Sequence, residues 1–409
     1  MAKNNFGAYN IEDLRQLAKK KVPRGVFDYV DGGAEDGIAV QNNRDAYTQL
    51  KIRNRVLVDV SARSTETTIF GKKIAMPFGI SPTGTAGLMW YGGEAGLAVA
   101  ATEMGVPCTV ALNAQTSMEE IREVAPNGDL WFQVYTWPDK DLSMKQIERI
   151  KSVGFETLIV TVDGPVGSNR EYNHKNGFSM PLKYSPTLFA QLLAKPRWLV
   201  SVLLKHYIER GAPTMVNYPD ELISKITDPM LKHMVTKADN LTWEHIQRIR
   251  DVWPGNLLVK GLQSHEDAVL AKENGLEGVI LSNHGGRYVD CAPAPLQVLG
   301  EVREAVGDDF TVIIDSGARR GSDIVKALAC GADMVMSGRP TLFGAAVAGA
   351  DGSYRALEIF KSEMDRVMAQ LGLSTVDEIG PQIFWEPPAW VRKPEGLLEE
   401  KVQLRAQTG

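Results

Sequence analysis

Four stretches of this chain repeat one order: a segment with helical periodicity, a glycine, and then a short run of mostly β-branched apolar residues. They are AVAATEMGVPCTVAL, IERIKSVGFETLIVTVD, AVLAKENGLEGVILSN and IVKALACGADMVMSGR, with glycines at Gly105, Gly154, Gly275 and Gly331. Glycine commonly ends a helix because it adopts positive φ without strain. The repeat therefore predicts helices that alternate with buried strands.

Four further apolar runs, at 74–81, 129–134, 257–261 and 310–317, raise the number of expected strands to eight. Nearly continuous apolar strands that alternate with helices indicate a parallel sheet covered on both faces. The sequence therefore predicts an α/β fold, a (β/α)8 TIM barrel. A doubly wound open sheet is the competing topology, but no G-x-G-x-x-G follows the first strand. The 409 residues, 44% of them hydrophobic, can bury such a core.

The segments around the barrel define one expected domain over residues 1–409. Its parts are an N-terminal helical segment (1–65), the barrel (66–370), an insertion or lid after the fourth strand (164–240) and a C-terminal tail (371–409). Residues 67–76 resemble a hairpin that closes one end of the barrel. Within the insertion, residues 185–210 mix leucines with basic and aromatic side chains. That composition fits a lid or a subunit-packing helix, or else a helix in peripheral contact with a membrane.

Composition excludes several classes of function. A net charge of -5 provides no basic surface for nucleic acid. The three cysteines form no CxxC pair, which suits a reducing compartment and argues against a cysteine-rich metal site. The N-terminus MAKNNFGAYN lacks the apolar core of a signal peptide. We therefore expect a cytoplasmic protein, without a metal, that acts on small molecules.

Polar residues follow most of the predicted strands. In a barrel the carboxyl ends of the strands meet on one rim, where catalytic residues gather. The residues expected on this rim are Gln133, Tyr135, Thr161, Asp163, Arg170, Lys260, Ser282, Asn283, His284, Arg287, Asp315, Gly317, Arg319, Arg320, Gly338 and Arg339. Charged groups are rarely buried unless they are paired or used, so the rim is the expected active site.

Two features of the rim carry specific chemistry. DSGARRG and SGRP, after the last two strands, offer backbone amides and arginines near helix starts, which suits a phosphorylated ligand. The glycines could instead only permit tight turns. His284 ends a buried strand, and the barrel brings Asp163 to the same rim, so an Asp-oriented imidazole could act as general base. A structural ion pair is the alternative.

Several long motifs together resemble the family of FMN-dependent 2-hydroxy-acid oxidases and dehydrogenases, which includes glycolate oxidase, lactate oxidase, the flavin domain of flavocytochrome b2, and the (S)-mandelate and L-lactate dehydrogenases. The motifs are PRGVFDYVDGGAED, MPFGISPTG, WFQVY, TVDGPVGSNRE, LLVKG, SNHGGRYVD, IDSGARRGSDIVKALACGAD and SGRP. They occur in the family's order from residue 23 to about residue 370. The resemblance implies FMN as cofactor and a 2-hydroxy acid as substrate.

The resemblance also implies roles for individual residues. His284 matches the catalytic base and Asp163 its supporting carboxylate, with hydrogen passing from the substrate to the flavin N5. Arg287 and Arg170 match the pair that binds the substrate carboxylate, assisted by Tyr29, while Tyr135 faces the substrate hydroxyl. Lys260 matches the lysine near the flavin N1 and O2. The remaining matches to cofactor contacts are Pro82, Thr83, Gln133, Thr161, Ser282, Asp315, Gly317, Arg319, Gly338 and Arg339.

The chain departs from the family pattern beside the expected ring. Ala111 stands where many members have a serine, so one hydroxyl contact is missing. Gly84, which we place among both the substrate and the flavin contacts, replaces an alanine of glycolate oxidase. Asn113 replaces a tryptophan, and Tyr288 replaces a glutamine with no assignable effect. We expect a substrate bulkier than glycolate.

The sequence therefore predicts oxidation of an L- or (S)-2-hydroxy acid, lactate- or mandelate-like, to the 2-keto acid. Reoxidation is expected from a quinone or another carrier such as a cytochrome, and the family implies a homotetramer. An oxygen-dependent oxidase or monooxygenase is the close alternative. A flavin-free barrel lyase or isomerase acting on a phosphorylated metabolite, or a non-catalytic flavin-binding protein, are alternatives of other classes.

Overall fold

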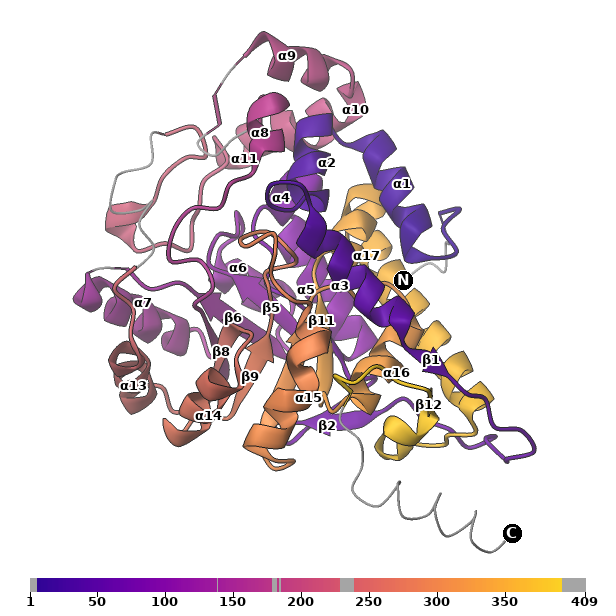
Figure 1. Cartoon of the computed structure of the whole chain (residues 1–409). Helices are drawn as coiled ribbons and strands as arrows, with labels where there is room; N and C mark the ends of the chain where they lie inside the picture. The colour runs from indigo at the N-terminus through magenta and orange to yellow at the C-terminus, as the bar shows by residue number, and fades with distance from the viewer. Residues whose placement is uncertain (1–5, 138, 179–181, 184, 229–238, 392–409) are drawn as a thin grey trace, which may run out of the picture.

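Eight parallel strands close into a barrel in a computed structural model that describes residues 6–137, 139–178, 182–183, 185–228 and 239–391. Around the barrel the strands run in the order β10, β11, β4, β5, β6, β7, β8, β9 (Figure 1). Their bounds are β4 Phe78–Ile80, β5 Cys108–Ala111, β6 Leu130–Val134, β7 Thr157–Thr161, β8 Asn256–Leu262, β9 Gly278–Leu281, β10 Thr311–Asp315 and β11 Met334–Ser337. The predicted (β/α)8 barrel is confirmed, and the open sheet is excluded.

Helices cover the outside of the barrel between successive strands (Figure 1). They are α5 Gly93–Met104, α6 Met118–Val124, α7 Lys140–Ser152, α13 Trp243–Val252, α14 His265–Glu273, α15 Pro295–Val306, α16 Gly321–Ala329 and α17 Arg339–Leu371. All four glycines of the repeat adopt positive φ, for example 75° at Gly105, whose N–H donates to Ala101 at the end of α5. The helix stops predicted from these glycines are confirmed.

A separate apolar cluster fills the barrel interior. It comprises Ile69, Ile74, Trp131, Ile159, Leu258, Ile280, Ile313, Met334 and Met336. Two of these belong to the predicted hairpin, now seen as β2 Thr67–Ile69 and β3 Lys72–Ile74, which closes the barrel where β4 begins. The expectation of one strand over 74–81 is wrong at its start. Ile74 pairs with Thr67 in the hairpin, and the barrel strand begins only after Pro77, which has no N–H to donate.

The N-terminal segment packs along the barrel and meets the C-terminal part of the chain. It contains α1 Ile11–Lys21, α2 Arg24–Asp31, α3 Ile38–Gln49 and β1 Lys51–Ile52. The tail forms η3 Val376–Glu378, η4 Pro381–Ile383 and β12 Phe384–Trp385, and β12 pairs antiparallel with β1. Residues 372–391 are therefore part of the fold, whereas the rest of the predicted tail lies outside the described residues.

The predicted insertion follows β7 and is largely helical. It contains α8 Glu171–Lys175, α9 Pro186–Leu193, α10 Pro196–Trp198, the π-helix η1 Leu199–Leu204, α11 Lys205–Arg210 and η2 Asp220–Leu222. Figure 1 shows α8, α9 and α10 near α2, beyond one end of the barrel. Gln191 of α9 accepts a hydrogen bond from the Gly25 amide at 2.7 Å, and Trp198 Nε1 donates to the Leu88 carbonyl at 2.9 Å. The insertion is thus fixed to both α2 and α4 (Ala86–Met89).

Candidate active site

A cavity of about 430 Å³ opens at the carboxyl ends of the barrel strands. Sixteen of the predicted site residues line it: Tyr29, Pro82, Thr83, Gly84, Gln133, Tyr135, Thr161, Arg170, Lys260, His284, Arg287, Asp315, Gly317, Arg319, Gly338 and Arg339. Asp163 and Ser282 stand just behind this surface, where they bond to His284 and Lys260 respectively. The expected convergence on one rim is therefore present. The role of each residue stays a prediction.

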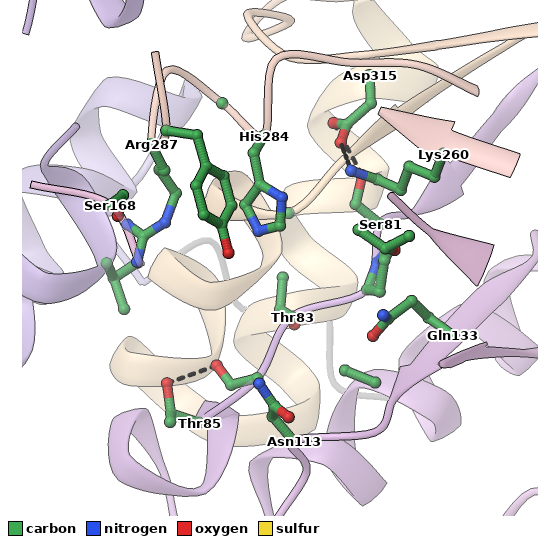
Figure 2. A pocket seen from close by; sticks show the side chains of 18 of the residues that line it. Ser81, Thr83, Thr85, Asn113, Gln133, Ser168, Lys260, His284, Arg287 and Asp315 are labelled. Atoms are coloured by element: carbon green, nitrogen blue, oxygen red, sulfur yellow. Dashed lines mark hydrogen bonds and ion pairs between the residues drawn. The ribbon is translucent and has the colours of Figure 1, made fainter. Parts of the chain in front are cut away.

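Lys260 and Asp315 form a buried ion pair at the base of the cavity (Figure 2). The ammonium lies 3.0 Å from Asp315 Oδ2 and donates to Ser282 Oγ at 2.9 Å, while Ser81 Oγ donates to Asp315 Oδ1 at 3.0 Å. Burial alone raises the pKa of the Asp315 carboxyl, but the Lys260 charge and these hydrogen bonds bring it below its ordinary value. The cavity therefore has a fixed cation whose position is set from three strand ends.

His284 faces the cavity while its Nδ1 lies 3.0 Å from Asp163 Oδ1. The backbone at His284 has a φ of 55°, an unusual conformation for a residue with a side chain. Its N–H donates to Ser282 Oγ at 3.0 Å, which helps to hold this conformation. A carboxylate on Nδ1 fixes the tautomer, so the lone pair of the neutral imidazole is on Nε2. The imidazole of His284 is thus placed to act as a general base, and the Asp163 carboxylate orients it.

The two glycines after His284 are required by close neighbours. A Cβ on Gly285 would lie 2.5 Å from Arg339 Nη1, and a Cβ on Gly286 would lie 2.6 Å from the Val40 amide nitrogen of α3. Both residues also adopt positive φ, 68° and 75°. The turn after β9 directs the His284 imidazole into the cavity. Its two glycines leave the space that Arg339 and α3 occupy on the other side of the turn.

Arg287 and Arg170 form the first cationic group of the cavity. Arg287 Nη1 donates to the Tyr29 carbonyl at 2.7 Å, and the two guanidinium carbons lie 5.1 and 5.8 Å from the centre of the Tyr29 ring. Neither forms an ion pair with a carboxylate of the described residues. Burial, and next the nearby Arg170 charge, lower the pKa of Arg287 to about 10. Two cations held together this way favour an anionic ligand such as a carboxylate.

Arg319 and Arg339 form a second cationic group, near the start of α17. Arg339 donates to the Val30 carbonyl at 2.8 Å and to the Gly32 carbonyl at 2.7 Å. Burial, and next the Arg339 charge, lower the pKa of Arg319 to about 9. In the described part of the chain no acidic side chain lies within ion-pair distance of either arginine. Helix α17 begins here with Gly338 as its N-cap, so its backbone amides add to a site suited to phosphate.

The polar atoms between these groups fit a flavin ring. Gln133 Nε2 and Thr161 Oγ1 are buried but have no hydrogen-bond partner among the described residues, a costly state unless a ligand satisfies them. Both line the same cavity as Lys260, and Figure 2 shows Gln133 across from His284. Pro82 and Ala111 add apolar surface to the lining. The cavity therefore offers phosphate, polar and apolar contacts in the combination that FMN requires.

Tyr288, whose effect could not be assigned from the sequence, packs against the His284–Asp163 pair. Its ring meets the His284 imidazole edge-on, with centroids 4.8 Å apart, and its centre lies 5.9 Å from the Arg170 guanidinium carbon. Burial raises its pKa to about 12, so it stays a neutral phenol near neutral pH. Tyr288 thus limits the orientation of the imidazole.

Sequence reasoning missed several residues that line the cavity, among them Ser81, Leu112, Trp137, Met215 and Tyr218. Ser81 could have been found, because it directly follows the first barrel strand. Met215 and Tyr218 had no such signal, since they reach the cavity only through the path of the insertion.

Two residues expected on the rim, Asn283 and Arg320, do not line the cavity. The expectation for Asn283 is wrong because its buried side chain turns to α3, where Nδ2 donates to Asn43 Oδ1 at 2.7 Å. The Arg320 side chain instead pairs with Glu363 of α17 at 2.7 Å, outside the lining. Arg320 is the N-cap of α16, and its side chain extends toward the neighbouring helix. The expectation for Arg320 is therefore wrong, although the adjacent Arg319 lines the cavity as predicted.

Comparisons with known proteins agree with this geometry. The family model described as FMN-dependent dehydrogenase matches residues 18–386. The (S)-mandelate dehydrogenase of Pseudomonas putida is 39% identical over 91% of this chain and 93% of its own length. The L-lactate dehydrogenase of Acinetobacter baylyi is 33% identical over 91% of this chain and 96% of its own. A crystal structure of the monotopic membrane protein (S)-mandelate dehydrogenase superposes with a TM-score of 0.85 at 37% identity, covering 93% of this chain and 99% of that one.

Proposed function

The chain belongs to the FMN-dependent dehydrogenase family, and we propose that within it the protein oxidises an L- or (S)-2-hydroxy acid, lactate- or mandelate-like, to the 2-keto acid. It is an oxidoreductase acting on CH–OH donors, with FMN as cofactor. Family membership favours this flavin chemistry over a flavin-free lyase or isomerase. One observation carries the proposal: the His284–Asp163 pair and the cations Arg287 and Arg170 line or border one cavity.

Two groups of residues would hold FMN. Those for the ring and the start of the ribityl chain are Pro82, Thr83, Gly84, Gln133, Thr161, Lys260 and Ser282. Those for the rest of the ribityl chain and the phosphate are Asp315, Gly317, Arg319, Gly338 and Arg339. When bound, FMN supplies the acceptor for the hydrogen and electrons that leave the substrate carbon. The fixed Lys260 charge favours the build-up of negative charge beside it.

The chain's own residues bind and orient the substrate and move its proton. Arg287 and Arg170 bind the substrate carboxylate, with Tyr29 between them, and so fix the reacting carbon. His284 Nε2 takes the proton of the substrate hydroxyl, and Asp163 stabilises the imidazolium that forms. Tyr135 donates a hydrogen bond to the same substrate oxygen. Burial keeps its pKa well above the ordinary value, so it remains a donor.

The insertion supports a membrane-bound electron acceptor, such as a quinone. Phe189, Leu193 and Ile208 are 53%, 72% and 75% exposed, and basic side chains such as Lys205 lie among them. Exposed apolar residues beside cations are typical of helices that lie in a membrane interface. No single described helix is long and apolar enough to span a membrane. The segments Pro186–Leu193 and Pro196–Arg210 reach that length and apolar character only when taken together, and the chain bends by 93° between them.

We infer that this surface touches the cytoplasmic face of a membrane, which gives a peripheral enzyme of the cell interior. A lid or subunit contact is the competing use of the same surface. The homotetramer expected from the family resemblance also stays a prediction, and sedimentation of the purified protein would test it. Oxygen is the competing acceptor, because Ala111 removes a hydroxyl from the lining that many members have.

Anaerobic bleaching of the purified yellow holoenzyme tests the function. We expect (S)-lactate or (S)-mandelate to remove the flavin absorbance faster than glycolate, because Gly84 and Asn113 enlarge the cavity. The colour should return quickly with a quinone analogue and slowly with oxygen. Fast return with oxygen would make the protein an oxidase. If no 2-hydroxy acid bleached the flavin, the proposed activity would be wrong.

A further inference from the structure

The second half of the insertion builds one wall of the cavity. This segment, residues 211–228, is here called the return arm. Its Met215 and Tyr218 line the cavity together with Leu112, Asn113 and Trp137. The Trp137 and Tyr218 rings meet edge to face, with centroids 5.6 Å apart. A wall of two aromatic rings, a thioether and a leucine favours an aromatic ligand group over a methyl group.

The return arm is fixed to the barrel beside Tyr218. The side chain of Asn217 is fully buried; its Oδ1 accepts from the Met118 amide at 2.7 Å and its Nδ2 donates to the Thr116 carbonyl at 3.0 Å. Its backbone carbonyl accepts from Gln146 Nε2 at 2.7 Å. These three bonds join the arm to the loop after β5, to the first residue of α6 and to α7. Tyr218 is therefore held in a defined place rather than on a freely moving lid.

Tyr218 and Asn113 present a neutral hydrogen-bonding pair to the cavity. The Tyr218 hydroxyl donates to Asn113 Oδ1 at 2.7 Å, which fixes the amide and leaves Nδ2 as its donor. Burial raises the pKa of Tyr218, so the hydroxyl keeps its proton. Gly84 makes room for the pair, because a Cβ there would lie 2.9 Å from Asn113 Cβ. Figure 2 shows Asn113 on the far side of Thr83 from His284.

Resting on the proposed function, we propose that the Tyr218–Asn113 pair binds a hydroxyl group on the ring of an aromatic (S)-2-hydroxy acid. Asn113 Nδ2 donates to the phenol oxygen, and the Tyr218 oxygen accepts the phenol proton. A substrate without the hydroxyl leaves both groups facing an apolar ring, which costs binding energy. A charged group on the ring of the substrate would meet no oppositely charged side chain among the described residues of this wall. Ring-hydroxylated mandelates are thus the favoured substrate class.

Steady-state kinetics of the holoenzyme test the pair. The substrates are (S)-mandelate and its 3- and 4-hydroxy derivatives. We expect the wild type to prefer one hydroxylated isomer by about tenfold in kcat/KM, which corresponds to about 1.4 kcal/mol. Tyr218→Phe and Asn113→Leu should each lower kcat/KM more for that isomer than for mandelate, so that the preference falls below about threefold. Tyr9→Phe, at an exposed tyrosine outside the cavity, is the matched control and should keep the preference.

Binding of acids that cannot be oxidised gives a second readout. Phenylacetate and its ring-hydroxylated forms should perturb the flavin absorbance, with the hydroxylated acid tighter in the wild type and not in Tyr218→Phe. Equal kcat/KM for mandelate and both hydroxylated isomers in the wild type would overturn the proposal, as would an unchanged preference in both variants. If no 2-hydroxy acid bleached the flavin, the proposed function itself would be wrong. That result differs from the loss of a preference among substrates that do bleach it.

Discussion

Asp163 Oδ1 and His284 Nδ1 lie 3.0 Å apart, although β7 and β9, which precede the two residues, are separated in the barrel by β8. An amide in place of the carboxylate can neither stabilise an imidazolium nor select the tautomer. Asp163→Asn should therefore lower kcat by about 10²-fold or more while FMN stays bound. Stopped-flow flavin bleaching measures this, with Asp141→Asn, at an exposed position of α7, as control. An undiminished rate would leave the pair only a structural role.

His284 itself should be indispensable for the chemical step. His284→Gln should retain the flavin spectrum but lose about 10²- to 10⁴-fold in turnover, the scale of a lost general base. Because position 284 has a φ of 55°, His284→Asn is a useful second variant, since asparagine tolerates this conformation better. Both variants should reduce the flavin at similarly low rates in single-turnover experiments. Full activity in either variant would remove the imidazole from the mechanism.

Arg287→Lys tests whether a fork, rather than a charge, binds the substrate. Lysine cannot make parallel hydrogen bonds to a carboxylate, and it also gives up the defined bond to the Tyr29 carbonyl. We expect a higher KM and about a 10²-fold lower kcat/KM. Arg320→Lys, in the pair with Glu363 outside the cavity, is the matched control. Normal kinetics for Arg287→Lys would mean that the carboxylate binds elsewhere.

The pH dependence of carboxylate binding follows from the same residue. Burial, and next the Arg170 charge, lower the pKa of Arg287 to about 10 in the ligand-free cavity. An anion binds the protonated form, so affinity should be constant below that pKa and weaken by about tenfold per pH unit above it. Titration with phenylacetate, followed by flavin absorbance, measures the effect. The neutral amide of the same acid should show no such decline, and a flat profile for both would contradict the assignment.

The exposed apolar residues of the insertion should control membrane binding. Leu193→Glu combined with Ile208→Glu places two charges on the α9 and α11 surfaces and should release the protein from anionic lipid vesicles in a flotation assay. The anaerobic rate with the hydroxy acid should persist, because neither residue lines the cavity. Leu57→Glu, at a fully exposed leucine outside the insertion, should not alter flotation. Vesicle binding that survives the double change would favour a lid or a subunit contact.

The barrel could be predicted because its strands are buried on both faces and so appear as apolar runs in the sequence. The helix stops at Gly105 and Gly154 could be predicted as well, because each glycine separates a helical pattern from an apolar run. The boundary at Ile74 could not, since one apolar run serves both the hairpin and β4, and only the pairing with Thr67 separates them. Strand β12 was missed because a two-residue strand has no periodicity.

The rim of the site could be predicted for a topological reason: closure of parallel strands brings their carboxyl ends together. This placed His284, Lys260 and Asp315 correctly without any knowledge of side-chain geometry. Tyr218 could not be found in this way, because its position depends on the buried bonds of Asn217 within a long insertion. The sequence pattern therefore predicts the site residues at the ends of the barrel strands. It does not predict those on the return arm, which forms one wall of the cavity.

Helix α2 is synthesised early but is held by arginines that come much later in the chain. The Tyr29 carbonyl accepts from Arg287, 258 positions onward, and the Val30 carbonyl accepts from Arg339, 309 positions onward. On a ribosome, the nascent N-terminal segment must wait for most of the polypeptide before it can dock. The wall of the pocket formed by α2 and these two arginines can therefore be completed only after the last barrel strand has been synthesised.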